Sequence, residues 1–275
     1  MLGLFESLKP DRTGLAAVSP QTHRLGSHPD PAPQPVTPTS GRIVGKLEVA
    51  DLALEIPGRR LLSSASLAVN AGECLAIVGP SGVGKTTLLN CIAGISTPAA
   101  GSVTVDDIEL SRLPSSERSA FRLRHIGMVF QFGELLPELT LLENVALPLR
   151  LLGEDRRAAE ERASARLAEV GLADQARSRP ELLSGGEIQR GSIARALVHD
   201  PSLVLADEPT GMLDEDNTGR IVDLLIESTR RAGAALLIVT HNPTVARAAD
   251  RLMMIRGGQL LVADGGTLHA AMQPS

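Results

Sequence analysis

The chain has 275 residues, of which 43% are hydrophobic, enough for the core of one large domain or two small ones. Its formal net charge is -5, so there is no basic excess, and four phenylalanines are its only aromatic residues. This composition argues against nucleic-acid binding through base stacking.

Residues 1–45 combine many prolines with Ser, Thr and Gly, which predicts a disordered N-terminal extension. The alternative is a docking segment anchored by Leu4 and Phe5.

The start of the chain lacks the cationic and apolar segments of a secretory signal. The longest apolar runs, such as 234–239, are far shorter than the roughly 20 residues that cross a bilayer as a helix. We therefore expect any membrane role to depend on a partner.

Alternating apolar and polar residues over 46–49, 52–56 and 66–69 predict a small antiparallel sheet. A continuous apolar run at 74–78 then predicts a buried strand, and residues 86–95 have the apolar spacing of a helix. The two cysteines, Cys74 and Cys91, fall in these two elements, so we expect core residues and not a disulfide or a zinc site.

A glycine-rich loop joins that strand to that helix. It follows the pattern Gly, four residues, Gly, Lys and Ser or Thr, and it comprises Gly79, Pro80, Ser81, Gly82, Val83, Gly84, Lys85 and Thr86, with Thr87 following. Its backbone N–H groups can curve round a phosphate, and the helix start adds the positive end of its dipole. Lys85 would bridge the terminal phosphates and Thr86 would give a hydroxyl to magnesium. A plain capping turn is the alternative, but lysine is rare in this chain, which makes a chance match improbable.

A second buried strand is predicted at 126–130, and Gln131 follows it at once, ahead of a loop at 132–137. Helical patterns cover 141–152 and 154–170. The polar, Arg-rich stretch 115–124 is assigned to no element.

The next helix is expected to begin at a serine and a pair of glycines. Ser184, Gly185 and Gly186 leave backbone donors exposed at a helix that runs to Leu197, which makes a second phosphate site. Taken alone, an ordinary cap by Ser184 with no ligand is the favoured interpretation. Gly191 inside the same helix costs about 1 kcal/mol relative to Ala and has no functional explanation from sequence.

A short apolar strand at 203–206 ends in two carboxylates, Asp207 and Glu208. Beside a phosphate loop, this pair suggests one metal-holding group and one base: Asp207 would bind magnesium and Glu208 would polarise the attacking water. The alternative is a solvent-facing pair at the end of a strand.

The sequence pattern in the remainder of the chain predicts a turn at 211–214, a helix at 221–231, a buried strand at 234–240 and a hairpin at 252–262. His241 ends the buried strand, where it is either a surface residue or a contact to the terminal phosphate.

In this order, the motifs resemble those of the nucleotide-binding subunits of ABC transporters, and the resemblance covers about residues 46–266. Residues 79–86 match Walker A, Gln131 the Q-loop glutamine and His241 the switch histidine. The signature matches 183–187, Walker B 203–208 and the D-loop 211–214. Residues 131–140 and 143–149 look most like the branch of macrolide-export, lipoprotein-release and cell-division ATPases, and residues 206–211 support that placement.

The resemblance implies an α/β fold: a P-loop NTPase core with a mostly parallel sheet, an antiparallel β-subdomain and an inserted helical subdomain at about 132–183. The domain would span 46–267, with a tail at 268–275. By the same resemblance, Lys85, Gln131, Glu208 and His241 are catalytic, and Thr86, Gln131 and Asp207 hold Mg²⁺. ATP would lie between residues 79–87 of one chain and Ser184, Gly185 and Gly186 of a second chain packed head to tail.

This implies an ATPase, working as a homodimer or with a related subunit, that powers a separate integral-membrane permease from the cytoplasmic face of the plasma membrane. The cargo would be a lipid, lipoprotein, peptide or drug. The alternative is an ATPase that transports nothing and regulates an extracytoplasmic enzyme by force. A soluble ATPase acting on DNA or ribosomes is weaker, because the chain has neither a coiled-coil insertion nor a second cassette.

The sequence departs from the family pattern in two places. Ile56 stands where the family usually stacks adenine on an aromatic ring, so we expect modest affinity and base discrimination. Gly191 and Ser192 replace a pair that is commonly more apolar, which puts the stiffness of that helix in question.

Overall fold

The computed structural model describes residues 46–264, so the predictions for 1–45 and 268–275 lie outside the described residues. The strands are β1 (Leu47–Ile56), β2 (Arg59–Val69), β3 (Cys74–Val78), β4 (Ala100–Val105), β5 (Ile108–Glu109), β6 (Ile126–Val129), β7 (Leu203–Asp207), β8 (Ala235–Thr240), β9 (Arg251–Arg256) and β10 (Gln259–Ala263). The α-helices are α1 (Lys85–Ile92), α2 (Ser115–His125), α3 (Leu141–Leu151), α4 (Arg156–Glu169), α5 (Gly185–Leu197), α6 (Glu215–Arg231) and α7 (Pro243–Ala248).

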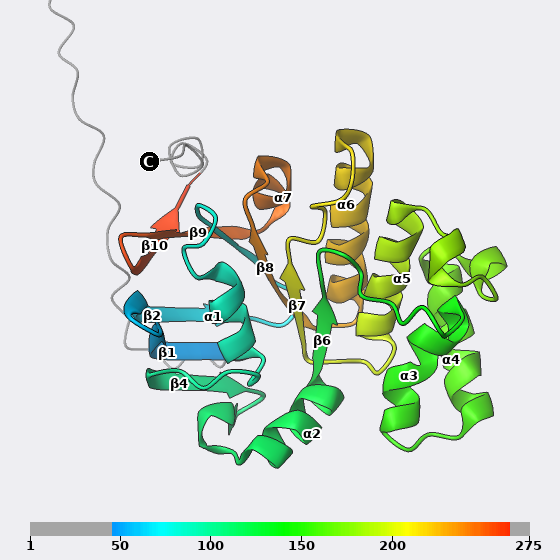
Figure 1. Cartoon of the computed structure of the whole chain (residues 1–275), viewed down its shortest axis with the longest axis horizontal. Coiled ribbons are helices and arrows are strands. Elements are labelled where there is room, and N and C mark those ends of the chain that lie inside the picture. The colour runs from blue at the N-terminus through cyan, green and yellow to red at the C-terminus, as the bar shows by residue number, and fades with distance from the viewer. Residues whose placement is uncertain (1–45, 265–275) are drawn as a thin grey trace, which may run out of the picture. The chain divides into compact units, whose positions relative to one another are not determined.

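The strands form a mixed sheet in the order β5-β4-β1-β2-β10-β9-β3-β8-β7-β6 (Figure 1). The run from β9 through β3, β8 and β7 to β6 is parallel, whereas β2, β1, β4 and β5 pair antiparallel. The predicted α/β fold with an antiparallel β-subdomain is confirmed. One parallel pairing, Gln259 with Ser64, connects the two parts of the sheet.

The parallel strands form the centre of the core. Every residue of β3 and of β8 is buried, as expected for strands covered on both faces. Helix α1 packs on them through Leu88, Leu89 and Ile92, the apolar positions that predicted it. It ends at Ile92, earlier than predicted, because Gly94 turns the chain with a φ of 66°.

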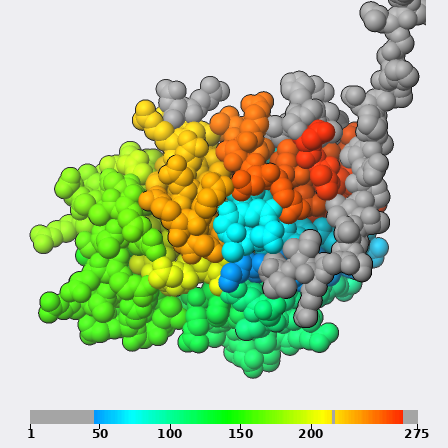
Figure 2. All heavy atoms as spheres, turned by 180° about the vertical axis from the view of Figure 1, so that it is seen from behind, coloured from blue at the N-terminus to red at the C-terminus, as the bar shows by residue number. Residues whose placement is uncertain are grey.

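Helices α3 and α4 form a separate layer beside α5, with a buried cluster of their own that includes Leu141, Leu149 and Leu167. This layer lies at the right in Figure 1, away from β1, β2 and β4, and at the left in the reversed view of Figure 2. Thr140 and Glu143 start α3 with a reciprocal capping box, and Pro148 lies within it. The structure thus places a helical subdomain between Gln131 and Ser184.

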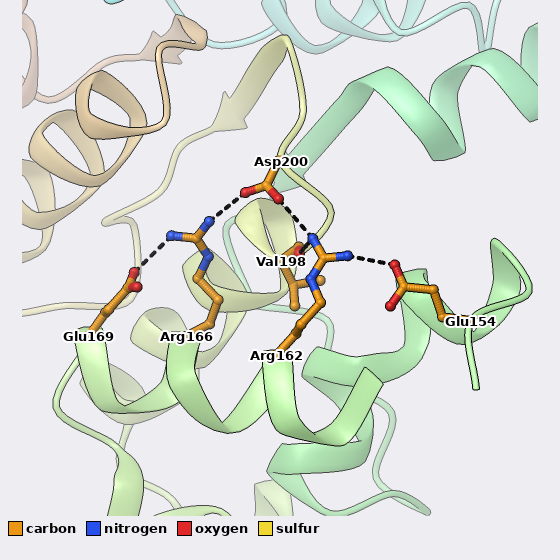
Figure 3. A network of polar contacts seen from close by, with 6 residues as sticks. All are labelled: Glu154, Arg162, Arg166, Glu169, Val198 and Asp200. Carbon is orange, nitrogen blue, oxygen red and sulfur yellow. Dashed lines mark hydrogen bonds and ion pairs between the residues drawn. The ribbon is translucent and has the colours of Figure 1, made fainter. Parts of the chain in front are cut away.

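Charged side chains tie α4 to the loop that follows α5. Asp200 accepts hydrogen bonds from Arg162 at 2.8 Å and from Arg166 at 2.6 Å, and Arg162 also donates to the carbonyl of Val198 (Figure 3). Glu154 and Glu169 pair with the outer sides of the two arginines. Each such pair at a surface contributes little, but the shared carboxylate joins two elements that are distant in the chain.

Two glycines allow α5 to approach its neighbours closely. A Cβ at Gly127 in β6 would lie 2.1 Å from the carbonyl oxygen of Ala196, and one at Gly191 would lie 2.6 Å from Cδ1 of Leu141 in α3. Ser192 beside it is fully buried. Gly191 therefore has a packing role that the sequence did not reveal.

Two helices were missed and one was predicted too short. Residues 115–125 form α2 and 243–248 form α7, which Asn242 caps through Thr244. Helix α6 begins at Glu215, not at 221, because the Asp214 carboxylate accepts the Asn217 backbone N–H. Among residues 46–264, no helix combines the length and apolar character that a membrane crossing requires.

Candidate functional site

The glycine-rich loop joins the buried strand β3 to the start of α1, as predicted. Gly82 and Gly84 have φ values of 74° and 109°, a region that favours glycine. No side chain caps α1. Backbone N–H groups of its first turn have no partner within the helix, so they can bind an anion.

The side chain of Lys85 folds back along this loop. Its Nζ donates to the carbonyls of Gly79 at 2.8 Å and Pro80 at 3.1 Å, and it lies 3.9 Å from Oε1 of Glu208. Burial lowers the pKa of Lys85, while the charges of Glu208 and Asp207 oppose that shift. The loop therefore holds a buried amine beside two carboxylates.

Asp207, the last residue of β7, is a hydrogen-bond partner of Thr86 at the start of α1. Burial, followed by the charge of Glu208, raises the pKa of Asp207, and the Thr86 hydrogen bond opposes the rise. A cation would relieve both costs. Hydroxyl, carboxylate and amide oxygens are the hard ligands that Mg²⁺ prefers, so the set of Thr86, Asp207 and Gln131 fits that ion chemically.

Glu208 lies one residue beyond β7 in a left-handed backbone conformation, with a φ of 45°. Its carboxylate is only 13% exposed. It accepts from the Thr240 hydroxyl at 2.9 Å and from the His241 backbone N–H at 3.2 Å, and its other oxygen lies 2.6 Å from Nδ1 of His241. It is therefore not a solvent-facing residue at the end of a strand.

Gln131 follows β6 and lies at the same edge of the sheet. A Cβ on Gly211 would be 2.6 Å from Nε2 of Gln131, so this side chain packs directly on the turn after Glu208. The space beside Gly211 therefore leaves no room for a larger residue at that position.

Lys85, Gln131 and Glu208 border an open pocket of about 400 Å³, whose lining does not include Asp207. Its lining comprises Ile56, Leu61, Ser81, Gly82, Gly84, Lys85, Thr86, Thr87, Gln131, Glu208 and His241. Most of these were predicted site residues. Leu61 was not predicted, because it has the pattern of an ordinary strand residue, yet its Cβ would be 3.2 Å from a Cβ on Gly84.

The serine and glycines at 184–186 do not line this pocket. Ser184 caps α5 in a reciprocal capping box with Glu187, whose carboxylate accepts the Ser184 hydroxyl at 2.7 Å and backbone N–H at 2.8 Å. These bonds, the side-chain one first, lower the pKa of Glu187. In Figure 1 the start of α5 is separated from α1 by β7 and β8. The capping that sequence suggested is present, and the exposed helix start stands apart from the phosphate loop of the same chain.

A family model described as "ABC transporter" matches residues 62–211, more than half of the chain. An uncharacterised ABC transporter ATP-binding protein of Mycobacterium tuberculosis is 45% identical over 205 residues, covering 74% of this chain and 83% of that protein. The lipoprotein-releasing system ATP-binding protein LolD of Legionella pneumophila strain Paris is 44% identical over 200 residues, covering 73% and 88%.

Among solved structures, a dimeric ATP-binding cassette in a post-hydrolysis state, bound to ADP and Pi, matches with a TM-score of 0.71 and 33% identity. The match covers 80% of this chain and 99% of that one. The chain belongs to the ABC transporter family. Within it, the chain is an ATP-binding subunit that hydrolyses ATP.

The aliphatic wall of the pocket generates a prediction about nucleotide affinity. Ile56 is 43% exposed at the end of β1 and lines the pocket together with Leu61. Changing Ile56 to Tyr adds a ring on which adenine can stack, worth about 0.5–1.5 kcal/mol, so the Kd for ATP should fall about 2- to 12-fold. Fluorescence titration with ATP and GTP measures this, and Ile56→Leu is the matched control without a ring. An unchanged Kd in Ile56→Tyr, or a wild-type chain that strongly prefers ATP over GTP, would contradict this account of the pocket.

Proposed function

We propose that two copies of the chain, or one copy and a related subunit, enclose ATP between the phosphate loop of one and the Ser184 helix start of the other. The observation that supports this most directly is the separation of these anion-binding elements within one chain, since Ser184 to Gly186 do not line the pocket. Two solved ATP-binding cassettes that match the chain are dimeric, which agrees with a shared site.

In this site we assign the phosphates to the backbone of residues 79–87 and to Lys85. Thr86, Asp207 and Gln131 would hold Mg²⁺, which supplies charge neutralisation at the terminal phosphates. Glu208 is the base that takes a proton from the attacking water, and His241 contacts the terminal phosphate.

Glu208→Gln should abolish turnover without loss of ATP binding, because the amide keeps the shape of the side chain but cannot accept the proton. We expect kcat to fall at least about 100-fold, with an ATP-bound dimer that persists on gel filtration. Phosphate release gives the rate. Glu161→Gln, at an exposed ion pair on α4, is the control and should retain full activity. Hydrolysis by Glu208→Gln at the wild-type rate would refute the assignment of the base.

Ser184→Arg tests the shared site. The arginine side chain is larger than serine and positively charged, so it obstructs the helix start of one chain, whereas the phosphate loop of the same chain is unchanged. ATP should therefore still bind, and turnover should fall about 100-fold or more. Equilibrium binding and steady-state hydrolysis separate the two effects. Ser116→Arg, on the exposed start of α2, should behave like wild type. Full-rate hydrolysis by Ser184→Arg would exclude the two-chain arrangement.

A groove of about 470 Å³ near Gln131 is our candidate docking surface for a cytoplasmic segment of a membrane permease. Its walls come from α2, β6, α3 and α5, and it contains Phe130, Pro148 and Leu151. Leu151 is 62% exposed. Arg195 in its wall donates to the carbonyls of Gly133 and Glu134, which ties the groove to the loop that follows Gln131. A permease segment bound in this groove would therefore be connected, through Arg195 and this loop, to Gln131 at the nucleotide site.

Leu151→Glu should abolish stimulation of the ATPase by permease-containing vesicles, because it puts a charge at the apolar wall of the groove. Basal hydrolysis should stay within about twofold, since an exposed substitution outside the site perturbs the fold little. Val262→Glu changes a similarly exposed apolar residue on β10, outside the groove, and serves as control. Normal stimulation of Leu151→Glu would remove the groove from the coupling path.

For the cargo we propose a lipid, lipoprotein, peptide or drug, moved by the permease while this subunit works at the cytoplasmic face of the plasma membrane. The similarity to a lipoprotein-releasing ATP-binding protein supports the lipidated class. The alternative is a regulator that transmits force to an extracytoplasmic enzyme. Reconstitution with the permease distinguishes them, since only a transporter shows ATP-dependent movement of cargo in vesicles.

A further inference from the structure

The two oxygens of the Glu208 carboxylate have different surroundings. Oε2 accepts the Thr240 hydroxyl at 2.9 Å and the His241 backbone N–H at 3.2 Å. Oε1 lies 2.6 Å from His241 Nδ1 and 3.9 Å from Lys85 Nζ. One oxygen is therefore held by the end of strand β8, and the other faces the ends of long side chains.

The donors to Oε2 have little freedom to move. Thr240 is the last residue of β8 and is fully buried, and the second donor belongs to the main chain. The ring at Oε1 is different, because the side chain of His241 is 61% exposed. Exposed side chains change rotamer within nanoseconds, so Oε1 can lose this contact while Oε2 keeps both of its own.

A neighbouring backbone group orients the Thr240 hydroxyl. Its oxygen accepts the backbone N–H of Asn242 at 2.9 Å, and Asn242 in turn caps α7. A hydroxyl has one proton to donate, and with this acceptor position occupied the proton is directed at Glu208. The start of α7 and the end of β8 together determine the direction of the bond.

The same strand also holds the main chain of Glu208. The Glu208 backbone N–H donates to the carbonyl of Val239 at 2.9 Å, next to Thr240. A φ of 45° is unfavourable for a residue with a side chain, so the surrounding structure must enforce it. Contacts at 239–241 thus restrain both the backbone and one carboxylate oxygen of Glu208.

We infer that Thr240 is a positioning residue for hydrolysis: its hydroxyl anchors Oε2 so that Oε1 is the oxygen that accepts the proton of the attacking water. This rests on the proposed role of Glu208 as the base. In the step, the water oxygen bonds to the γ-phosphorus, the bond from that phosphorus to the ADP oxygen breaks, and the water proton passes to Oε1. The products are ADP and phosphate, and the proton later leaves Oε1 for phosphate or solvent.

A serine and alanine pair isolates the hydroxyl, because both variants lack the methyl group of Thr240 and only Thr240→Ser keeps the donor. Thr240→Ala and the isosteric Thr240→Val should lower kcat about 10- to 100-fold, the usual effect of losing a hydrogen bond to a charged group. Thr240→Ser should stay within about threefold of wild type. The KM and Kd for ATP, and ATP-dependent dimerisation of the full chain, should not change in any of them.

Thr229→Val is the matched control for loss of a buried threonine hydroxyl. Thr229 in α6 is 1% exposed, and its hydroxyl has no hydrogen-bond partner in the described part of the chain. Its kcat should equal that of wild type. Circular dichroism identifies folded variants, and the serine and alanine pair decides the result if Thr240→Val does not fold.

Two results would overturn the inference: a wild-type kcat in Thr240→Ala, or equal losses in Thr240→Ser and Thr240→Ala. If Glu208→Gln is inactive in the same assay, only the role of Thr240 fails. If Glu208→Gln is active, the proposed function itself fails.

Discussion

The parallel register of β3, β8, β7 and β6 is the constraint on which the rest of the structure depends. It pairs Val78 with Thr240 and Val239 with Asp207, so the carboxyl ends of these strands meet at one edge of the sheet. Gln131, Glu208 and His241 lie within two residues of that edge, and Lys85 returns to it by donating to the carbonyls of the loop that follows β3. Because these strands are buried on both faces, a shift in register would disrupt the close packing of their apolar side chains and would also separate the site, so folding stability and catalysis require the same alignment.

The sequence predicted the parts of the site that local pattern determines. The glycine loop, the two carboxylates at the end of β7 and His241 each follow an apolar run, so their places at strand ends could be read directly. Leu61 and Thr240 could not be found this way. Their importance arises from contacts with residues far along the chain, at Gly84 and Glu208, which no periodicity encodes.

Among the helices, too, local sequence pattern predicted some features and contacts distant in the sequence determined others. Helix α3 was predicted from its apolar positions and α4 from its alternating opposite charges, which form i,i+4 pairs, whereas α2 is polar and buries only Phe121, so no run of apolar residues marked it. Gly191 looked like a defect within α5. Its reason is the close approach of Leu141 from α3, a tertiary fact that overrides helix propensity.

The arginine pair on Asp200 has a geometric consequence for the proposed pairing of two chains. It joins α4 to the chain just beyond the last turn of α5, opposite the Ser184 end. Helix α5 has 13 residues, about 20 Å at 1.5 Å per residue. At this length, a change of about 10° in the direction of α5 about its tethered end corresponds to about 3.5 Å at Ser184, more than the length of one hydrogen bond. The Asp200 tether and the Ser184 helix start thus lie at opposite ends of one helix.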